Sequence, residues 1–141
     1  MKLKTIVKAF LQKKGENALI LKVLDTIKDF NRRLQLKPAY RELKDAYDEY
    51  AKEQTSLVKE LIKEYCDEEN KTRGEKLDPE KFEGVPFSKM SEYTKRHNEL
   101  LETEVETKPL KFTLKEIEES KIVFSEMDLL DEFILEIDKV S

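Results

Sequence analysis

Few side chains in this sequence have the chemistry of a nucleophile or a general base. Ser56 and Lys59 match the Ser-x-x-Lys pattern, in which a lysine activates a serine one helical turn away. The companion motifs Ser-Asp-Asn and Lys-Thr-Gly are absent. His97 and Cys66 are the single histidine and the single cysteine, and they fall on different predicted elements. We interpret His97 as a hydrogen-bonded core residue and Cys66 as a half-buried residue at a helix end.

Nucleotide and metal sites are not indicated either. The three glycines stand at positions 15, 74 and 84, too far apart for a phosphate-binding glycine-rich loop. The acidic run Asp67-Glu-Glu-Asn70 lacks the glycine and the ligand spacing of a calcium loop. Paired carboxylates are so frequent here that their spacing discriminates nothing. We therefore expect no enzyme activity, no cofactor and no bound metal.

Charge is abundant and unevenly distributed. Charged residues make up 41% of the chain, with a net charge of -4. Residues 1–37 hold ten basic against three acidic residues, whereas residues 38–70 hold five against ten and residues 71–141 hold twelve against eighteen. We interpret the basic face as solvated and partly neutralised by the acidic segment of residues 38–70, with nucleic acid or another polyanion as a less favoured partner. Its members are Lys4, Lys8, Lys14, Lys22, Lys28, Arg32 and Arg33.

The acidic C-terminal region allows the opposite idea, mimicry of a phosphate backbone. Solubility and favourable charge in the first turn of a helix explain these residues more simply. The N-terminal residues lack the unbroken apolar core of a signal peptide, and no stretch has the length of a membrane span. We expect a protein of the cytoplasm that does not enter a membrane.

The strongest pattern is a long helix predicted from Pro38 to about Cys66, within a segment of residues 38–70. Apolar residues recur there at alternating spacings of three and four, as in a coiled coil, with Gln54 as the polar exception. The two positions of this repeat are Leu36, Leu43, Tyr50, Leu57 and Tyr40, Tyr47, Gln54, Leu61. Pro38 suits the first turn of a helix. We therefore expect a connection at residues 35–37, a single kinked helix being the alternative.

The remaining segments complete a mainly α prediction. Residues 1–37 form a basic helical arm of two helices, the second starting after Asn17 and folding back on the long helix as an antiparallel hairpin. Residues 71–87 form an exposed loop with one helical turn at 78–82. Residues 88–141 form a small α+β cap, containing a helix over 88–102, a capping box at 113–116 and a final helix from Ser125. At most two short strands, around 105–112 and 121–124, pair there. We predict a single domain spanning residues 1–141.

Residues 98–134 contain a recognisable series of short motifs. They are Asn98-Glu-Leu-Leu-Glu-Thr-Glu-Val-Glu106, Pro109-Leu-Lys-Phe112, Ile117-Glu118, Phe124-Ser-Glu-Met-Asp-Leu-Leu130 and Phe133-Ile134. This series resembles a family of small, uncharacterised phage-encoded proteins with a helical hairpin. The resemblance implies a phage protein that acts by binding. It supplies no catalytic residues.

We therefore expect a non-enzymatic phage protein that acts through protein–protein interaction, such as a virion assembly or accessory factor, in the host cytoplasm or the virion. The alternative is a phage inhibitor of a host nucleic-acid-processing or defence enzyme, acting through its charged faces. The far end of the long helix has more apolar residues than one partner helix needs. This favours a homo-oligomer, most simply an antiparallel dimer, and coverage by the C-terminal helix is the alternative. The predicted interface residues are Tyr47, Tyr50, Gln54, Leu57, Leu61 and Tyr65.

Overall fold

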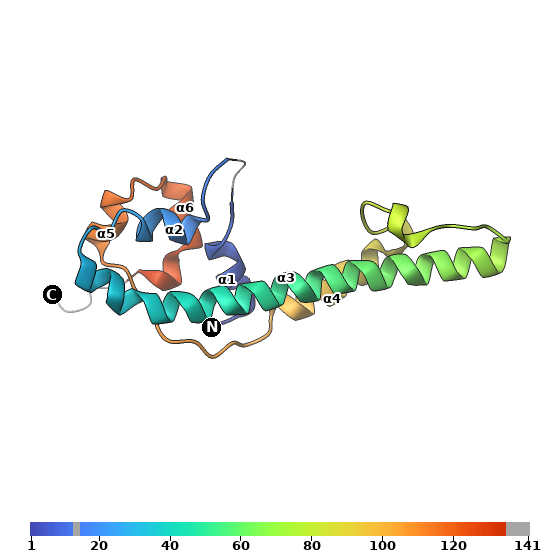
Figure 1. Cartoon of the computed structure of the whole chain (residues 1–141), viewed down its shortest axis with the longest axis horizontal. Helices are drawn as coiled ribbons and strands as arrows, with labels where there is room; N and C mark the ends of the chain where they lie inside the picture. Colours follow the sequence, from blue (N-terminus) through green and yellow to red (C-terminus); the bar gives the residue numbers. More distant parts are fainter. Residues whose placement is uncertain (13–14, 135–141) are drawn as a thin grey trace. The chain divides into compact units, whose positions relative to one another are not determined.

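The computed structural model describes residues 1–12 and 15–134, and these are mainly helical (Figure 1). The mainly α class is thus confirmed. In chain order the helices are α1 (Leu3–Ala9), α2 (Leu19–Leu24), α3 (Phe30–Arg73), the 3₁₀ turns η1 (Pro79–Lys81) and η2 (Phe87–Lys89), α4 (Met90–Leu101), α5 (Leu114–Glu119), α6 (Phe124–Leu129) and the 3₁₀ turn η3 (Asp131–Phe133).

The long helix begins earlier than predicted. α3 runs unbroken for 44 residues with Pro38 inside it, so the connection predicted at residues 35–37 is wrong. Pro38 is exposed, and water can therefore solvate the carbonyl that the missing N–H leaves free. Leu36 and Ala39 are buried on either side, and their packing holds the helix together across the proline.

The true break lies at residues 25–29, between α2 and α3. There the side chain of Asp29 accepts a hydrogen bond from the backbone N–H of Asn31 (3.0 Å), as a helix N-cap does. The predicted second helix of the basic arm is therefore divided: its first part is α2, and its last residues begin α3.

The chain forms two compact units, and α3 contributes residues to both. Unit 1 comprises residues 1–47 and 104–141, and unit 2 comprises residues 48–103. These boundaries differ from those of the four predicted segments. Whether the two units unfold together as a single domain stays a prediction.

Unit 1 has the larger apolar core. α1 contacts α6, and α2 contacts α5. Phe10 stacks on Tyr47, with ring centroids 4.9 Å apart. The buried side chains include Ile6, Ile20, Val23, Leu43, Leu110, Phe112, Ile117, Leu130 and Phe133.

Extended pairing in the described residues of unit 1 is limited to isolated bridges. Lys2 pairs with Glu104 antiparallel, and Phe112 pairs with Ile134 in parallel. A strand at 121–124 is wrong, because Lys121 has a φ of 58° and α6 already begins at Phe124. The predicted final helix is shorter than expected, since α6 ends at Leu129. The rest of the predicted final helix, residues 135–141, lies outside the described residues.

One prediction in unit 1 is confirmed in atomic detail, and a second is confirmed only in part. Thr113 and Glu116 form the expected capping box, with each side chain bonded to the backbone N–H of the other residue (3.2 and 2.9 Å). The basic face is also partly neutralised, but by other residues than the predicted segment 38–70. Arg32 binds Glu116 instead, with both carboxylate oxygens 2.9 Å from Arg32 nitrogens.

Unit 2 is a helical hairpin, but the predicted hairpin paired the long helix with the helix that precedes it, not with α4. The second half of α3 and α4 run antiparallel, joined by the loop that contains η1 (Figure 1). Tyr50 pairs with His97, Gln54 with Tyr93 and Glu68 with Lys89, so residue numbers rise on α3 as they fall on α4. The buried residues of this unit include Tyr50, Leu57, Leu61, Ile62 and Cys66.

Candidate functional site

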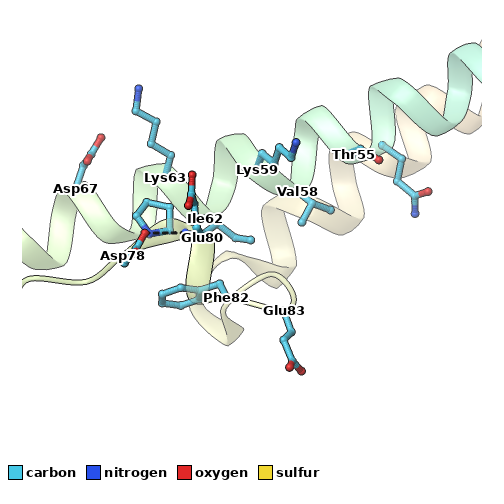
Figure 2. A pocket seen from close by; sticks show the side chains of 12 residues that line it. Thr55, Val58, Lys59, Ile62, Lys63, Asp67, Asp78, Glu80, Phe82 and Glu83 are labelled. Atoms are coloured by element: carbon cyan, nitrogen blue, oxygen red, sulfur yellow. Dashed lines mark hydrogen bonds between the residues drawn. The ribbon is translucent and has the colours of Figure 1, made fainter.

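Unit 2 contains a groove of about 880 Å³, between α3 and the loop that follows it (Figure 2). One wall, which we call the helix wall, consists of α3 residues within 54–67. The other, the loop wall, consists of residues 78–83. The apolar floor comprises Ile62, which is buried, and Val58 and Phe82, which are half-buried.

The loop wall is held in place by short-range interactions that the sequence encodes. Gly74 has a φ of +67°, which lets the chain reverse directly after α3. The Asn70 side-chain oxygen then accepts a hydrogen bond from the Leu77 backbone N–H (2.8 Å) and so fastens the returning chain to α3. Asp78 caps η1 by accepting from the Glu80 N–H (3.0 Å), as its position before Pro79 predicted.

An aromatic contact fixes the end of the loop wall. Phe82 meets Tyr65 of α3 edge to face, with ring centroids 5.8 Å apart and an interplanar angle of 68°. Such pairs contribute about 1 kcal/mol beyond the area they bury. This contact anchors the loop across the floor of the groove.

Ion pairs attach α4 to the same stretch of α3. The Lys89 ammonium lies 3.0 Å from a Glu68 carboxylate oxygen, and the Arg96 guanidinium lies 2.9 Å from Glu60. Hydrogen bonding to these carboxylates raises the pKa of both Lys89 and Arg96. These two ion pairs therefore fasten the hairpin at two separate places along α3.

The walls of the groove carry opposite charges. Lys59 and Lys63 stand one turn apart on the helix wall, with Asp67 beyond them, whereas the loop wall presents Asp78, Glu80 and Glu83 (Figure 2). Within the described part of the chain, no ion pair engages Lys59, Lys63, Glu80 or Glu83. These charges can therefore pair with a bound molecule without breaking an existing contact.

The residues with nucleophile or base chemistry do not gather at this groove. Ser56 is exposed on α3, and no hydrogen bond joins it to Lys59 in the described residues. Cys66 is 1% exposed, and burial raises the pKa of its thiol. It is more deeply buried than the half-buried position we predicted.

His97 is hydrogen-bonded, as predicted, but it is half-buried and not a core residue. Its Nε2 lies 2.7 Å from the Tyr50 hydroxyl, and its ring stacks on Tyr93 with centroids 5.3 Å apart. The bond to Tyr50 joins α4 to α3, whereas the stacking on Tyr93 is a contact within α4. The structure thus shows a role for His97 in the packing of the hairpin.

The six predicted interface residues do not form one exposed surface. Tyr47 belongs to unit 1, where it stacks on Phe10. Of the five in unit 2, Tyr50, Leu57 and Leu61 are at most 7% exposed. Tyr65 and Gln54 are half-buried against Phe82 and Tyr93.

This burial removes the reason given for a homo-oligomer. The far end of the long helix was expected to be uncovered, but α4 and the loop wall cover it within the same chain. Gln54 and Tyr65 retain a link to the candidate site, because Gln54 lines the groove and Tyr65 supports Phe82. Self-association stays a prediction that needs another surface.

The groove itself was missed in the sequence. The turn at Asp78-Pro79 was recognised, but nothing local indicates that Phe82 returns to Tyr65, seventeen positions earlier. The mixture of Lys59, Lys63 and apolar Val58 and Ile62 on one helical face was the available signal.

The described residues were also compared with the requirements of a metal site and of a membrane-spanning helix. No group of three His, Cys, Asp or Glu side chains converges there as metal ligands would. Among the same residues, no helix combines the length and the apolar character needed to cross a bilayer.

Comparison with known protein families, curated sequences and solved structures yields no match.

Proposed function

We propose that this is a non-enzymatic phage protein that acts by binding another protein, as a virion assembly or accessory factor does. The observation that carries the binding role is the groove of unit 2. Apolar side chains of a partner can be buried against its apolar floor, and the unpaired charges on its walls can fix the orientation of that partner. The phage context rests on the resemblance over residues 98–134.

The groove suits a protein segment because it follows α3 for residues 54–67, about 20 Å of helix. Apolar contacts at Val58 and Phe82 can anchor a partner, while pairing with Lys59 and Lys63 sets its direction. A partner held mainly by the floor would tolerate salt, because ionic screening weakens charge pairs and leaves apolar burial intact.

The alternative function, inhibition of a nucleic-acid-processing or defence enzyme through charged faces, has less support. Two members of the basic face are occupied within unit 1. Arg32 pairs with Glu116, and Lys22 pairs with Glu16 and Glu126 (2.9 and 3.3 Å). Both basic residues are therefore partly neutralised before any partner arrives.

Affinity purification with matched variants tests the proposal. Val58→Asp places a charge on the groove floor, and Ser56→Asp places the same charge on an exposed position of α3 that does not line the groove. Both variants should retain wild-type helicity by circular dichroism. We expect a partner that co-purifies with wild type and Ser56→Asp and is lost with Val58→Asp.

A salt titration of the same complex separates the two functions. Retention of the partner as salt is raised supports binding through the apolar floor. Steep loss with salt, together with equal retention by both variants, would contradict the groove and favour the charged faces.

A further inference from the structure

Phe87 is the most exposed large apolar residue among the described residues. Its relative exposure is 94%, and Met90, one helical turn later, is 42% exposed. Phe87 begins η2, a structured turn that leads directly into α4. An aromatic side chain held this far into solvent by a defined turn is typical of an interface anchor.

This apolar pair lies near the groove. Phe87 follows Glu83 of the loop wall by four residues, so their Cα atoms are within about 14 Å. Lys89, in the same turn, is fixed to Glu64 and Glu68 of α3. Unit 2 therefore carries a protruding apolar pair and an apolar groove that are close to each other along the chain.

The charges on the groove walls are complementary to those of the same groove in a second copy of the chain. A twofold rotation about an axis along the groove places the helix wall of one copy opposite the loop wall of the other. Lys59 and Lys63 of each copy would then face the Glu80 and Glu83 of its partner. All four are without ion-pair partners in the described residues, so both sets of contacts are available.

We propose that the groove of unit 2 binds unit 2 of a second copy of this chain, with Phe87 as the apolar anchor and Lys59 and Lys63 paired with Glu80 and Glu83 across the interface. This inference deepens the proposed function and rests on it, because it names the partner of the same groove. It also gives self-association a surface different from the buried interface residues predicted from the sequence.

Sedimentation of the full chain across the micromolar range tests the anchor. Wild type should show a reversible monomer–dimer equilibrium. Phe87→Ala should raise the dimer dissociation constant about thirtyfold or more, as loss of an interface hot spot does. Phe124→Ala is the matched control, because Phe124 is 83% exposed but belongs to unit 1. It should leave the equilibrium unchanged.

Charge exchange tests the pairing. Lys59→Glu with Lys63→Glu makes both walls acidic, and Glu80→Lys with Glu83→Lys makes both walls basic. Each double variant alone should dimerise at least about tenfold more weakly, because like charges face each other. An equimolar mixture of the two should form a heterodimer, since opposite charges face each other at both contacts.

Three results would overturn the inference: a wild-type chain that stays monomeric at high micromolar concentration, equal effects of Phe87→Ala and Phe124→Ala, or a mixture that fails to associate when both variants are folded. The proposed function fails separately. If the chain is monomeric but a different protein is lost with Val58→Asp, the groove binds that protein and only the second copy is excluded.

Discussion

Replacing Glu116 by alanine should destabilise unit 1 measurably. One carboxylate performs two tasks there. It closes the capping box of α5 by accepting from the Thr113 N–H, and it binds the Arg32 guanidinium through both oxygens. The same Arg32 also donates to the Lys111 carbonyl (2.8 Å), so the loss loosens the segment before α5 as well.

The magnitude follows from these contacts. Loss of the cap costs about 1 kcal/mol. The ion pair has side chains only 27% and 14% exposed and bidentate geometry, so its loss costs about another 1–2 kcal/mol. A total of about 2–3 kcal/mol lowers the Tm of a chain of this size by roughly 8 °C.

The effect also has a defined dependence on pH. Hydrogen bonding to Arg32 lowers the pKa of Glu116 in the folded state. Its contribution is therefore complete above the ordinary carboxyl pKa of about 4.3 and is lost as the pH falls through the lower folded value. Thermal melts of wild type and Glu116→Gln should differ by a constant amount above about pH 5 and converge in more acidic buffer.

Glu119→Ala is the control. Its pair with Lys115 is long (4.0 Å) and both side chains are more than half exposed, so the melting temperature should not change measurably. Equal destabilisation by Glu116→Ala and Glu119→Ala, or a difference that persists unchanged to low pH, would refute the reasoning.

Further predictions concern the packing of each unit. Phe10→Asp should release α1, because Phe10 is 5% exposed and stacks on Tyr47; proteolysis near Gly15 should accelerate, and unchanged cleavage would refute docking of α1. Gly74→Ala should lower stability by about 1 kcal/mol in chemical denaturation, since an L-residue is strained at a φ of +67°; a stabilised variant would contradict this. Tyr50→Phe should cost about 1 kcal/mol by removing the bond to His97, and a neutral result would show that the pair is weak.

The sequence allowed prediction of those features that depend on neighbours along the chain. The capping box at Thr113, the Asp78 turn and the helical course of residues 38–70 all follow from local chemistry, and all are present. The break before α3 was placed wrongly because Pro38 suggests a helix start, whereas the Asp29 cap was hidden inside an apolar stripe.

Features that depend on distant contacts could not be predicted. The helix that packs on the second half of α3 is α4, through pairs such as Tyr50 with His97 and Glu60 with Arg96. The heptad pattern of α3 predicts that some helix packs there but does not indicate which one. The groove depends in the same way on Phe82 meeting Tyr65. The oppositely charged walls become a site only once that contact is made.

Site-specific photocrosslinking in cells that produce the protein tests most directly whether it acts by binding through its groove. A photoreactive amino acid at Thr55, exposed on the helix wall, should give discrete protein adducts. The same group at Glu53, exposed on α3 outside the groove, should give none. Adducts of twice the chain mass would identify a second copy, and other masses a different partner. Absence of adducts at Thr55, or equal adducts at both positions, would contradict the account.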